Sequence, residues 1–251
     1  MNTAVAFKYL KTLRRNPIDT FSMAVRPLFS VTLFAIFAST YIEGDTGVTF
    51  MVLSVALVNI IINSVQGSCY EARDDTSDSR SDIIILAPGG FHGFSAAQAI
   101  VQTAFASVQS LVVLLVSAPL LEIHYSGFAL KIVLTGVVLL IVTSYLLSLF
   151  LVKISILYDN FLAVSFTIVV LVTLGGAFYP VDALPDWVRT IALLNPLTYL
   201  IDLCRTPFIG GQPLVNYSTS VLVCVGFILL LVAVNFVVRS RRFDLSNRSR
   251  F

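Results

Sequence analysis

Charged side chains are scarce in this sequence, and long stretches of it contain none. Asp, Glu, Lys and Arg make up 12% of the 251 residues, about half the share found in a typical soluble domain. This scarcity excludes a soluble globular protein of ordinary composition. Uncharged stretches occupy residues 27–42, 46–70, 95–121, 132–152, 160–181 and 206–238.

These stretches have the composition of transmembrane helices. A helix needs about 20 apolar residues to cross a hydrocarbon core about 30 Å thick, and it satisfies its own backbone polar groups there. The stretches are too long and too uniformly apolar for the strands of a membrane barrel. We expect an all-α integral membrane protein with a single transmembrane domain over residues 1–251. Six transmembrane helices are expected at about 21–42, 47–70, 95–120, 128–152, 160–180 and 215–238.

Cysteine and histidine are also rare, which limits the chemistry that the chain can perform. Cys69, Cys204 and Cys224 show no metal-ligand or redox spacing, so we expect them to be packing residues. His92 and His124 fall near opposite surfaces by the expected boundaries and do not share a site. No glycine is followed by lysine, so no phosphate-binding loop is encoded. We therefore expect no catalytic residue, no metal site and no cofactor bound by this chain.

Basic residues gather before the first expected span and after the last. They are Lys8, Lys11, Arg14 and Arg15 on one side, and Arg239, Arg241, Arg242, Arg248 and Arg250 on the other. Lysine and arginine near membrane ends favour the cytoplasmic side. Both termini are therefore expected in the cytoplasm, which requires an even number of spans. We expect a multi-pass protein of the inner or plasma membrane of the cell.

The amino-terminal segment 1–20 also shows helical spacing. Its apolar residues Ala6, Leu10 and Leu13 fall along one side of a helix, and its basic residues Lys8, Lys11 and Arg15 along another. Such a helix lies along the cytoplasmic membrane surface. The alternative is a basic tail that only sets the topology.

The segment 71–94, between the second and third expected spans, is the most charged part of the chain. Residues 71–82 hold five acids and two arginines. Acids that share a helix face repel one another unless a basic partner meets them. We expect a cytoplasmic docking element here, and the alternative is a solvated turn. The residues in question are Glu71, Arg73, Asp74, Asp75 and Asp78.

The segment 181–214 interrupts the last third of the chain. Residues 190–201 are too few to span a membrane and suit a re-entrant or interfacial helical segment. Tyr179, Trp187 and Tyr199 fit the aromatic belt at the outer interface. Asp202 and Arg205, three residues apart, are placed to form a local pair.

These motifs resemble the membrane subunit of type-two ABC exporters, the group that includes polysaccharide, nodulation-factor and drug-resistance permeases. The likeness rests on Gly175–Pro180, Leu184–Trp187 and Leu194–Tyr199, closed by Asp202 and Arg205. Glu71 and Arg73, with Ile83–Pro88, resemble the family's loop between spans two and three, where a glutamate begins a short helix that ends near a proline. The acid-rich form of that loop departs from the family's more mixed charges.

The resemblance implies one half of an export pathway for an amphipathic, lipid-linked or drug-like substrate. Two permease subunits, identical or closely related, then pair with two ABC ATP-binding subunits, which carry ATP and Mg. The helix 1–20, with Lys8, Lys11 and Arg15, and the loop 71–88 contact those subunits. The re-entrant segments cap the outer end of the pathway. The residues of this outer gate are Gly175, Gly176, Tyr179, Pro180, Pro185, Trp187, Asn195, Pro196 and Tyr199.

Two other function classes fit the sequence less well. A secondary transporter usually carries ionisable residues at mid-membrane, and these are nearly absent from the expected spans. A membrane assembly protein without transport activity is the other alternative. The amides Asn59, Asn63, Gln98 and Gln102 either line a pathway or form interhelical hydrogen bonds, and we favour the hydrogen bonds.

Overall fold

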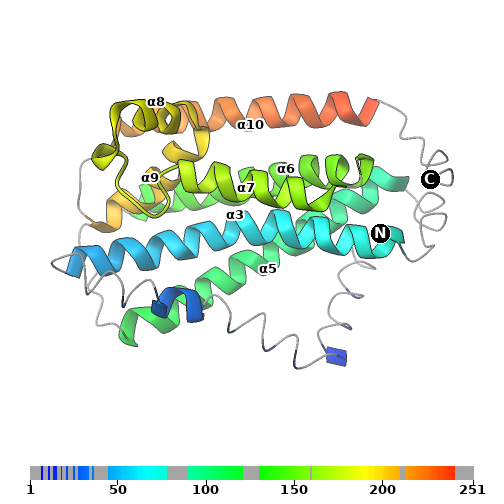
Figure 1. The fold of residues 1–251 in the computed structure, drawn as a ribbon, viewed down its shortest axis with the longest axis horizontal. Coiled ribbons are helices and arrows are strands. Elements are labelled where there is room, and N and C mark those ends of the chain that lie inside the picture. The colour runs from blue at the N-terminus through cyan, green and yellow to red at the C-terminus, as the bar shows by residue number, and fades with distance from the viewer. Residues whose placement is uncertain are drawn as a thin grey trace.

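The computed structural model describes residues 45–77, 90–120, 130–158, 160–209 and 213–240, together with residues 28–33 and single positions between 7 and 36. All regular elements of this part are helical, which confirms the all-α part of the expected fold class (Figure 1). The α-helices are α3 (Asp45–Ser77), α5 (Gly90–Leu120), α6 (Leu130–Leu157), α7 (Phe161–Leu174), α8 (Asp186–Leu194), α9 (Pro196–Ile209) and α10 (Tyr217–Ser240), with a 3-10 turn η1 at Val181–Ala183.

Four of the described helices are long and apolar enough to cross a membrane. They are Gly47–Asp75, Gly90–Ala118, Lys131–Leu157 and Tyr217–Val238. They correspond to the second, third, fourth and sixth expected spans. Helix α7, where the fifth was expected, has 14 residues, or about 21 Å of helix, less than the hydrocarbon thickness of about 30 Å. The count of six spans therefore stays a prediction.

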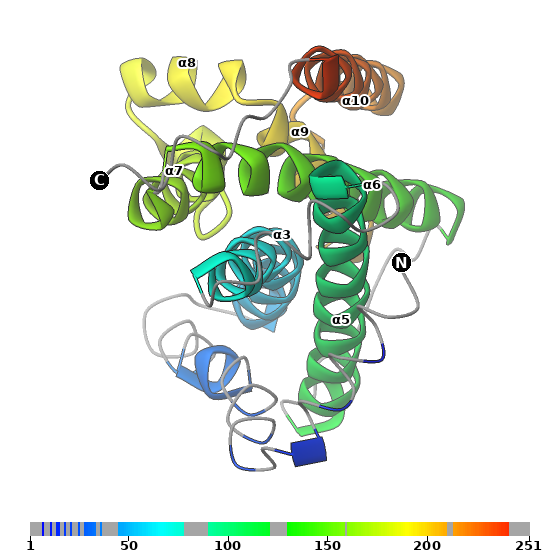
Figure 2. The same cartoon turned by 90° about the vertical axis from the view of Figure 1, so that its right-hand side faces the viewer.

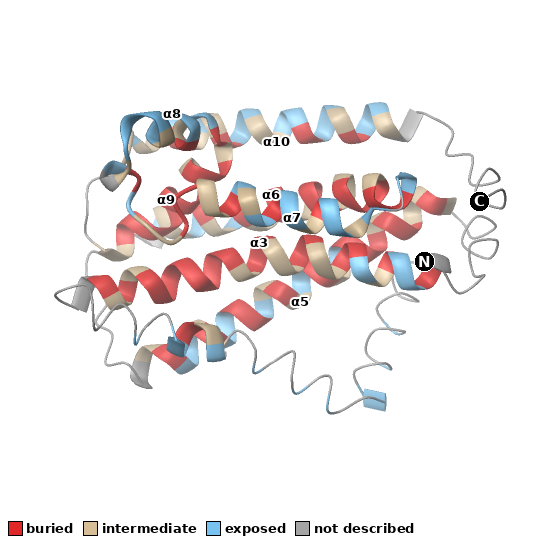
Figure 3. Ribbon diagram, in the orientation of Figure 1, coloured by how far each residue is buried: buried red, intermediate tan, exposed pale blue. Residues whose placement is uncertain are grey.

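Helix α3 is the central span. It packs against α5, α6, α7 and α9, and 72% of its most apolar window is buried, against 17% for α10. Figure 3 shows the same contrast, with α3 mostly buried and α10 mostly exposed along its length. The exposed apolar side chains of α10 are suited to lipid, so α10 lies at the periphery of the bundle.

The packing follows from apolar residues that the helices bring to one core. Ile61 of α3, Leu140 of α6, Ile168 of α7 and Leu197 of α9 are all fully buried there. A smaller cluster places Val31, from the region of the first expected span, against α3 and α5. That region is therefore part of the helical bundle where the structure describes it.

The two ends of the bundle differ. One end, named here the α8–α9 end, holds residues 175–216 where they are described, together with the amino-terminal turns of α3 and α10 (Figure 1). The opposite end holds the carboxyl-terminal turns of α3, α6 and α10. Figure 2 looks along α10, which is seen end-on, whereas α8 is seen lengthwise and so lies across α10. An amphipathic helix in this position suits a membrane interface.

The start of the 71–94 segment differs from its expectation. Residues 71–77 continue α3, so the prediction that Glu71 begins a short helix is wrong. Charged residues continue a helix readily once it leaves the membrane, and nothing between Tyr70 and Ser77 breaks it. Helix α5 already begins at Gly90, whose positive φ of 52° suits glycine at a helix start.

Candidate functional site

A glycine turn ends α7 at the α8–α9 end. Gly176 has a φ of +72°, and a Cβ there would lie 2.4 Å from Cγ2 of Val181. Both the backbone conformation and the space therefore require glycine. The Gly175 N–H bonds to the Leu171 carbonyl at 3.0 Å and closes the last turn of α7. Gly175 and Gly176, which were expected near the end of the fifth span, thus form a tight reversal that brings the chain back toward α8.

Asn195 joins three helices at the break between α8 and α9. Its Oδ1 accepts from the Leu197 N–H at 3.0 Å, which caps the start of α9. Its Nδ2 donates to the Leu171 carbonyl at 2.6 Å, near the end of α7. Pro196 follows as the first residue of α9, where its missing N–H removes no helical hydrogen bond. The Asn-Pro pair therefore divides the expected 190–201 segment into two helices.

Two tyrosines of the predicted gate donate hydrogen bonds to carbonyls in the last turns of helices. The hydroxyl of Tyr179 donates to the Thr173 carbonyl at 2.6 Å, and that of Tyr199 donates to the Leu193 carbonyl at 2.8 Å. Helix ends leave such carbonyls without intrahelical partners. The two tyrosines therefore stabilise the ends of α7 and α8.

The structure separates the remaining predicted gate residues from this hydrogen-bonded group. Pro180 and Pro185 are exposed and flank η1, while Trp187 is 72% exposed on α8. Nearby, Asp182 and Arg189 form an exposed ion pair of 2.8 Å. The predicted gate residues thus fall into two groups. We name the hydrogen-bonded group at the ends of α7, α8 and α9 the hinge, and the exposed group of Pro180, Pro185 and Trp187 the rim.

Asp202 and Arg205 are buried in α9 and bind different segments. The Asp202 carboxylate accepts from the Leu214 N–H and the Thr206 hydroxyl, each at 3.0 Å. Burial raises the pKa of this carboxyl, while these two hydrogen bonds lower it. Arg205 donates from Nη1 to the Gly176 carbonyl at 3.1 Å. The two side chains attract each other electrostatically, as their spacing predicted. Each also makes one contact beyond α9, Asp202 with Leu214 and Arg205 with Gly176.

The α3 residues predicted to contact an ATPase lie at the opposite end. On α3, Arg73 and Asp74 are exposed, Glu71 is half-buried and Asp75 is buried. Lys11 and Arg15 are helical and exposed, whereas Lys8 and Asp78 lie outside the described residues. The position at one end of a central span is consistent with a docking surface.

The amides of α3 and α5 meet in a polar seam. Asn59 donates from Nδ2 to Ser110 Oγ at 2.9 Å and to Gln109 Oε1 at 3.4 Å. Asn63 donates to the same Gln109 oxygen at 3.1 Å and to Asn59 Oδ1. The favoured interpretation of interhelical hydrogen bonds is therefore confirmed for Asn59 and Asn63.

The other two predicted amides lie farther along the seam, toward the opposite end of the bundle. Gln102 lies against Gly67, where an added Cβ would be 2.7 Å from its Oε1, and Gln98 lies one turn beyond it on α5. Both are buried. A possible role of these two amides in a pathway stays a prediction.

A second polar contact was not predicted. Lys153 of α6 is 2% exposed and donates from Nζ to Asn235 Oδ1 of α10 at 3.2 Å. Asn235 in turn donates from Nδ2 to the Leu146 and Leu231 carbonyls at 3.1 and 2.9 Å. The available signal was Lys153, the charge directly after the uncharged stretch 132–152, and Asn235, the single amide between residues 217 and 238. Because the two residues are 82 positions apart in the sequence, their contact could not be predicted from it.

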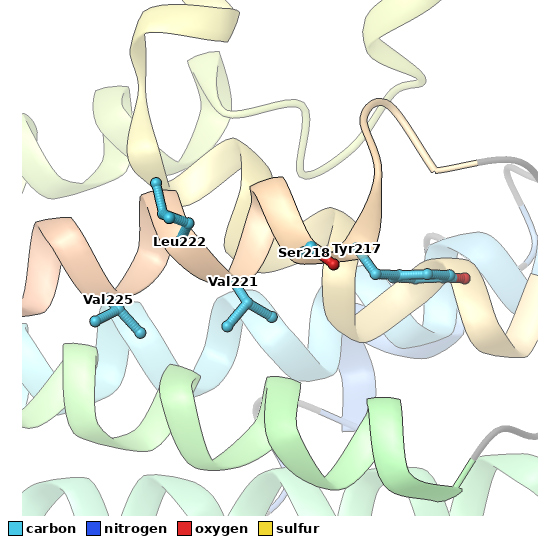
Figure 4. Close-up of a pocket in the computed structure, with 5 residues that line it drawn as sticks. All are labelled: Tyr217, Ser218, Val221, Leu222 and Val225. Atoms are coloured by element: carbon cyan, nitrogen blue, oxygen red, sulfur yellow. The ribbon is translucent and has the colours of Figure 1, made fainter.

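Figure 4 shows a recess of about 560 Å³ on the first turns of α10, lined by Tyr217, Ser218, Val221, Leu222 and Val225. These side chains come from one helix face and are mostly apolar. A small-molecule site needs polar groups that converge from several directions. The recess is therefore better suited to lipid than to a specific ligand.

Comparison with known proteins adds one match. Residues 90–209 match the family model described as ABC-2 type transporter. The matched range runs from the first residue of α5 to the last residue of α9 and so includes the glycine turn, Asn195, Asp202 and Arg205. No curated protein matches the chain.

Proposed function

Residues 90–209 belong to the ABC-2 type transporter family, and from that premise we propose that the chain is the transmembrane subunit of an ATP-driven ABC exporter. The protein is a membrane-embedded permease component and is not itself catalytic. ATP and Mg bind to a separate ATP-binding subunit, present in two copies, and a second permease subunit completes the pathway. The substrate is an amphipathic molecule, lipid-linked or drug-like.

The family match is the observation that carries this proposal. The hydrogen-bonded hinge of α7, α8 and α9 supports it, because the hinge lies within the matched range at one end of the bundle. In the proposed orientation this end is the outer gate, and both chain termini are cytoplasmic. Buried Lys153 at the opposite end accords with that orientation, since basic residues favour the cytoplasmic side.

Helix α3 gives the proposal a physical route for coupling. Its exposed Arg73 and Asp74 lie at the proposed cytoplasmic end, and its Phe50 lies under the Arg205 guanidinium at the other end. A continuous helix moves as one body, so a displacement imposed by an ATPase at one end reaches the gate. The docking surface consists of Glu71, Arg73, Asp74, Asp75 and Asp78, with Lys8, Lys11 and Arg15.

Copurification with the ATP-binding subunit tests the proposal directly. The full chain, coexpressed with a candidate ATPase and reconstituted in lipid nanodiscs, should form a stable complex with two copies of each subunit. Amphipathic substrates should then stimulate ATP hydrolysis. A complex that never forms with any ATPase of the same cell, while the permease remains folded, would contradict the proposal.

A further inference from the structure

The seam between α3 and α5 contains side-chain amides, which form hydrogen bonds with one another at only one end of the seam. Near mid-span, Asn59, Asn63, Gln109 and Ser110 bond across the two helices. About one to three turns closer to the proposed cytoplasmic end, Gln66, Gln98 and Gln102 form no side-chain hydrogen bond with the part of the chain that the structure describes. The seam thus contains a hydrogen-bonded network near mid-span and, beyond it, three amides without such bonds. We name Gln66, Gln98 and Gln102 the open amides.

These open amides lack partners although they lie deep in the bundle. Gln98 is 2% exposed and Gln102 is 5% exposed. Their amide groups form no hydrogen bond but are not completely closed off from solvent. Within a membrane span, an amide without a partner costs about 1–3 kcal/mol. Polar side chains in such positions usually face a bundle interior or a water-filled cavity. The open amides therefore require a polar occupant.

One face of α3 leaves this part of the seam accessible. The less buried residues along the helix recur every three or four positions, which places them on one stripe. They are Asn59, Ile62, Asn63, Gln66, Gly67 and Tyr70. The stripe mixes amides with apolar side chains, and it ends where Tyr70 contacts the Phe161 ring of α7 at 6.2 Å between ring centroids. An occupant with both a polar and an apolar part fits this mixture.

The charge of the occupant follows from what surrounds the seam. The two stretches that form the seam, residues 46–70 and 95–121, contain no charged side chain, so these two helices themselves offer no compensation to an ionic group. Amides supply both donors and acceptors without charge. On the proposed permease function, we infer that the open amides of Gln66, Gln98 and Gln102 bind the neutral, hydroxyl-bearing head of an amphipathic substrate.

A photoreactive alkyl glucoside tests this site on the full chain in phosphatidylcholine nanodiscs. Crosslinks should map to residues 59–70 and 95–110. Octyl glucoside should compete at least about tenfold better than octyl sulfate or octyltrimethylammonium, the factor that corresponds to about 1.4 kcal/mol. Free glucose should compete poorly, since it lacks the apolar part. Equal competition by the charged amphiphiles or by free glucose would overturn the inference.

Matched variants locate the binding groups. Gln102→Leu and Gln66→Leu should each weaken labelling by about tenfold, the loss expected for one or two hydrogen bonds. Ser107→Ala is the control on α5, because its hydroxyl bonds only to the Thr103 carbonyl of its own helix, at 2.7 Å. Labelling that survives both glutamine variants would also overturn the inference.

Association with the ATPase is measured on the same variants and separates the two proposals. Normal association without glucoside labelling contradicts only the site. Specific labelling without any ATPase partner leaves the site intact and contradicts the exporter function.

Discussion

Arg205 of α9 donates to the carbonyl of Gly176 at 3.1 Å, and its guanidinium carbon lies 4.0 Å from the centre of the Phe50 ring. One buried side chain therefore joins α9, the turn after α7 and the start of α3. From Phe50 to Asp74, α3 extends about 36 Å at about 1.5 Å per residue. Helix α3 thus extends from Phe50, which contacts Arg205, to the proposed ATPase surface at Asp74.

We expect Arg205→Met to destabilise the α8–α9 end. The change removes a charged hydrogen bond and leaves the Gly176 carbonyl without its donor, which should lower the free energy of unfolding by about 1.5–3 kcal/mol. Arg205→Lys should recover only part of the loss, since lysine lacks the planar group that stacks on Phe50. Thermal unfolding in nanodiscs measures both variants. A native Tm for Arg205→Met would show that the contact does not stabilise the fold.

Gly176→Ala tests the glycine turn, with Gly226→Ala in α10 as its control. Alanine at 176 is strained by the φ of +72° and would meet Val181 at 2.4 Å, so we expect a loss of at least about 1 kcal/mol. At Gly226 nothing lies within 4 Å of the added Cβ, so alanine should be neutral or slightly stabilising. Parallel Tm measurements compare the two. Equal effects at both positions would mean that the turn is not required.

The sequence was sufficient for the long helices because their signal is local. Helices α5, α6 and α10 each contain one uninterrupted apolar run, although α6 continues past Lys153 to Leu157. The extension of α3 through Glu71 was not predicted, since a charged segment after a span looks like a loop unless its helical propensity is weighed. The break at Asn195-Pro196 was visible in the sequence because both residues act on their own backbone.

The contacts of the candidate site could be predicted only in part. Asn195 and Leu171 are 24 residues apart, and Lys153 and Asn235 are 82 apart. Their pairing depends on how whole helices pack, which composition and periodicity do not encode. Asp202 and Arg205 show what spacing can and cannot predict. Their short spacing predicted a local interaction, which is present, but not their contacts with Leu214 and Gly176.

A double-mutant cycle tests the contact between Lys153 and Asn235. Lys153→Met removes the buried cation and leaves the Asn235 oxygen without this donor, so we expect a loss of about 1–3 kcal/mol. Asn235→Leu should be worse, because it leaves the buried ammonium without the asparagine. The double variant should be more stable than the sum of the two losses predicts. Additive changes in Tm would show that the two side chains are not coupled.

The final prediction concerns charge at the proposed cytoplasmic end of α3. If Glu71 and Asp74 dock onto an ATP-binding subunit, that subunit must present basic residues, since buried carboxylates without compensation are strongly disfavoured. Glu71→Gln and Asp74→Asn should therefore reduce association or transport several-fold while membrane insertion stays normal.

The control is Asp182→Asn, which removes an exposed carboxylate at the α8–α9 end, 2.8 Å from Arg189, and should leave association unchanged. Insertion, association and transport are measured separately on each variant. Because the spans are held together by packing that these amides do not alter, a selective loss of association would place the ATPase at this end. Native association in both amide variants would instead indicate that the contact is made by the amino-terminal helix through Lys11 and Arg15.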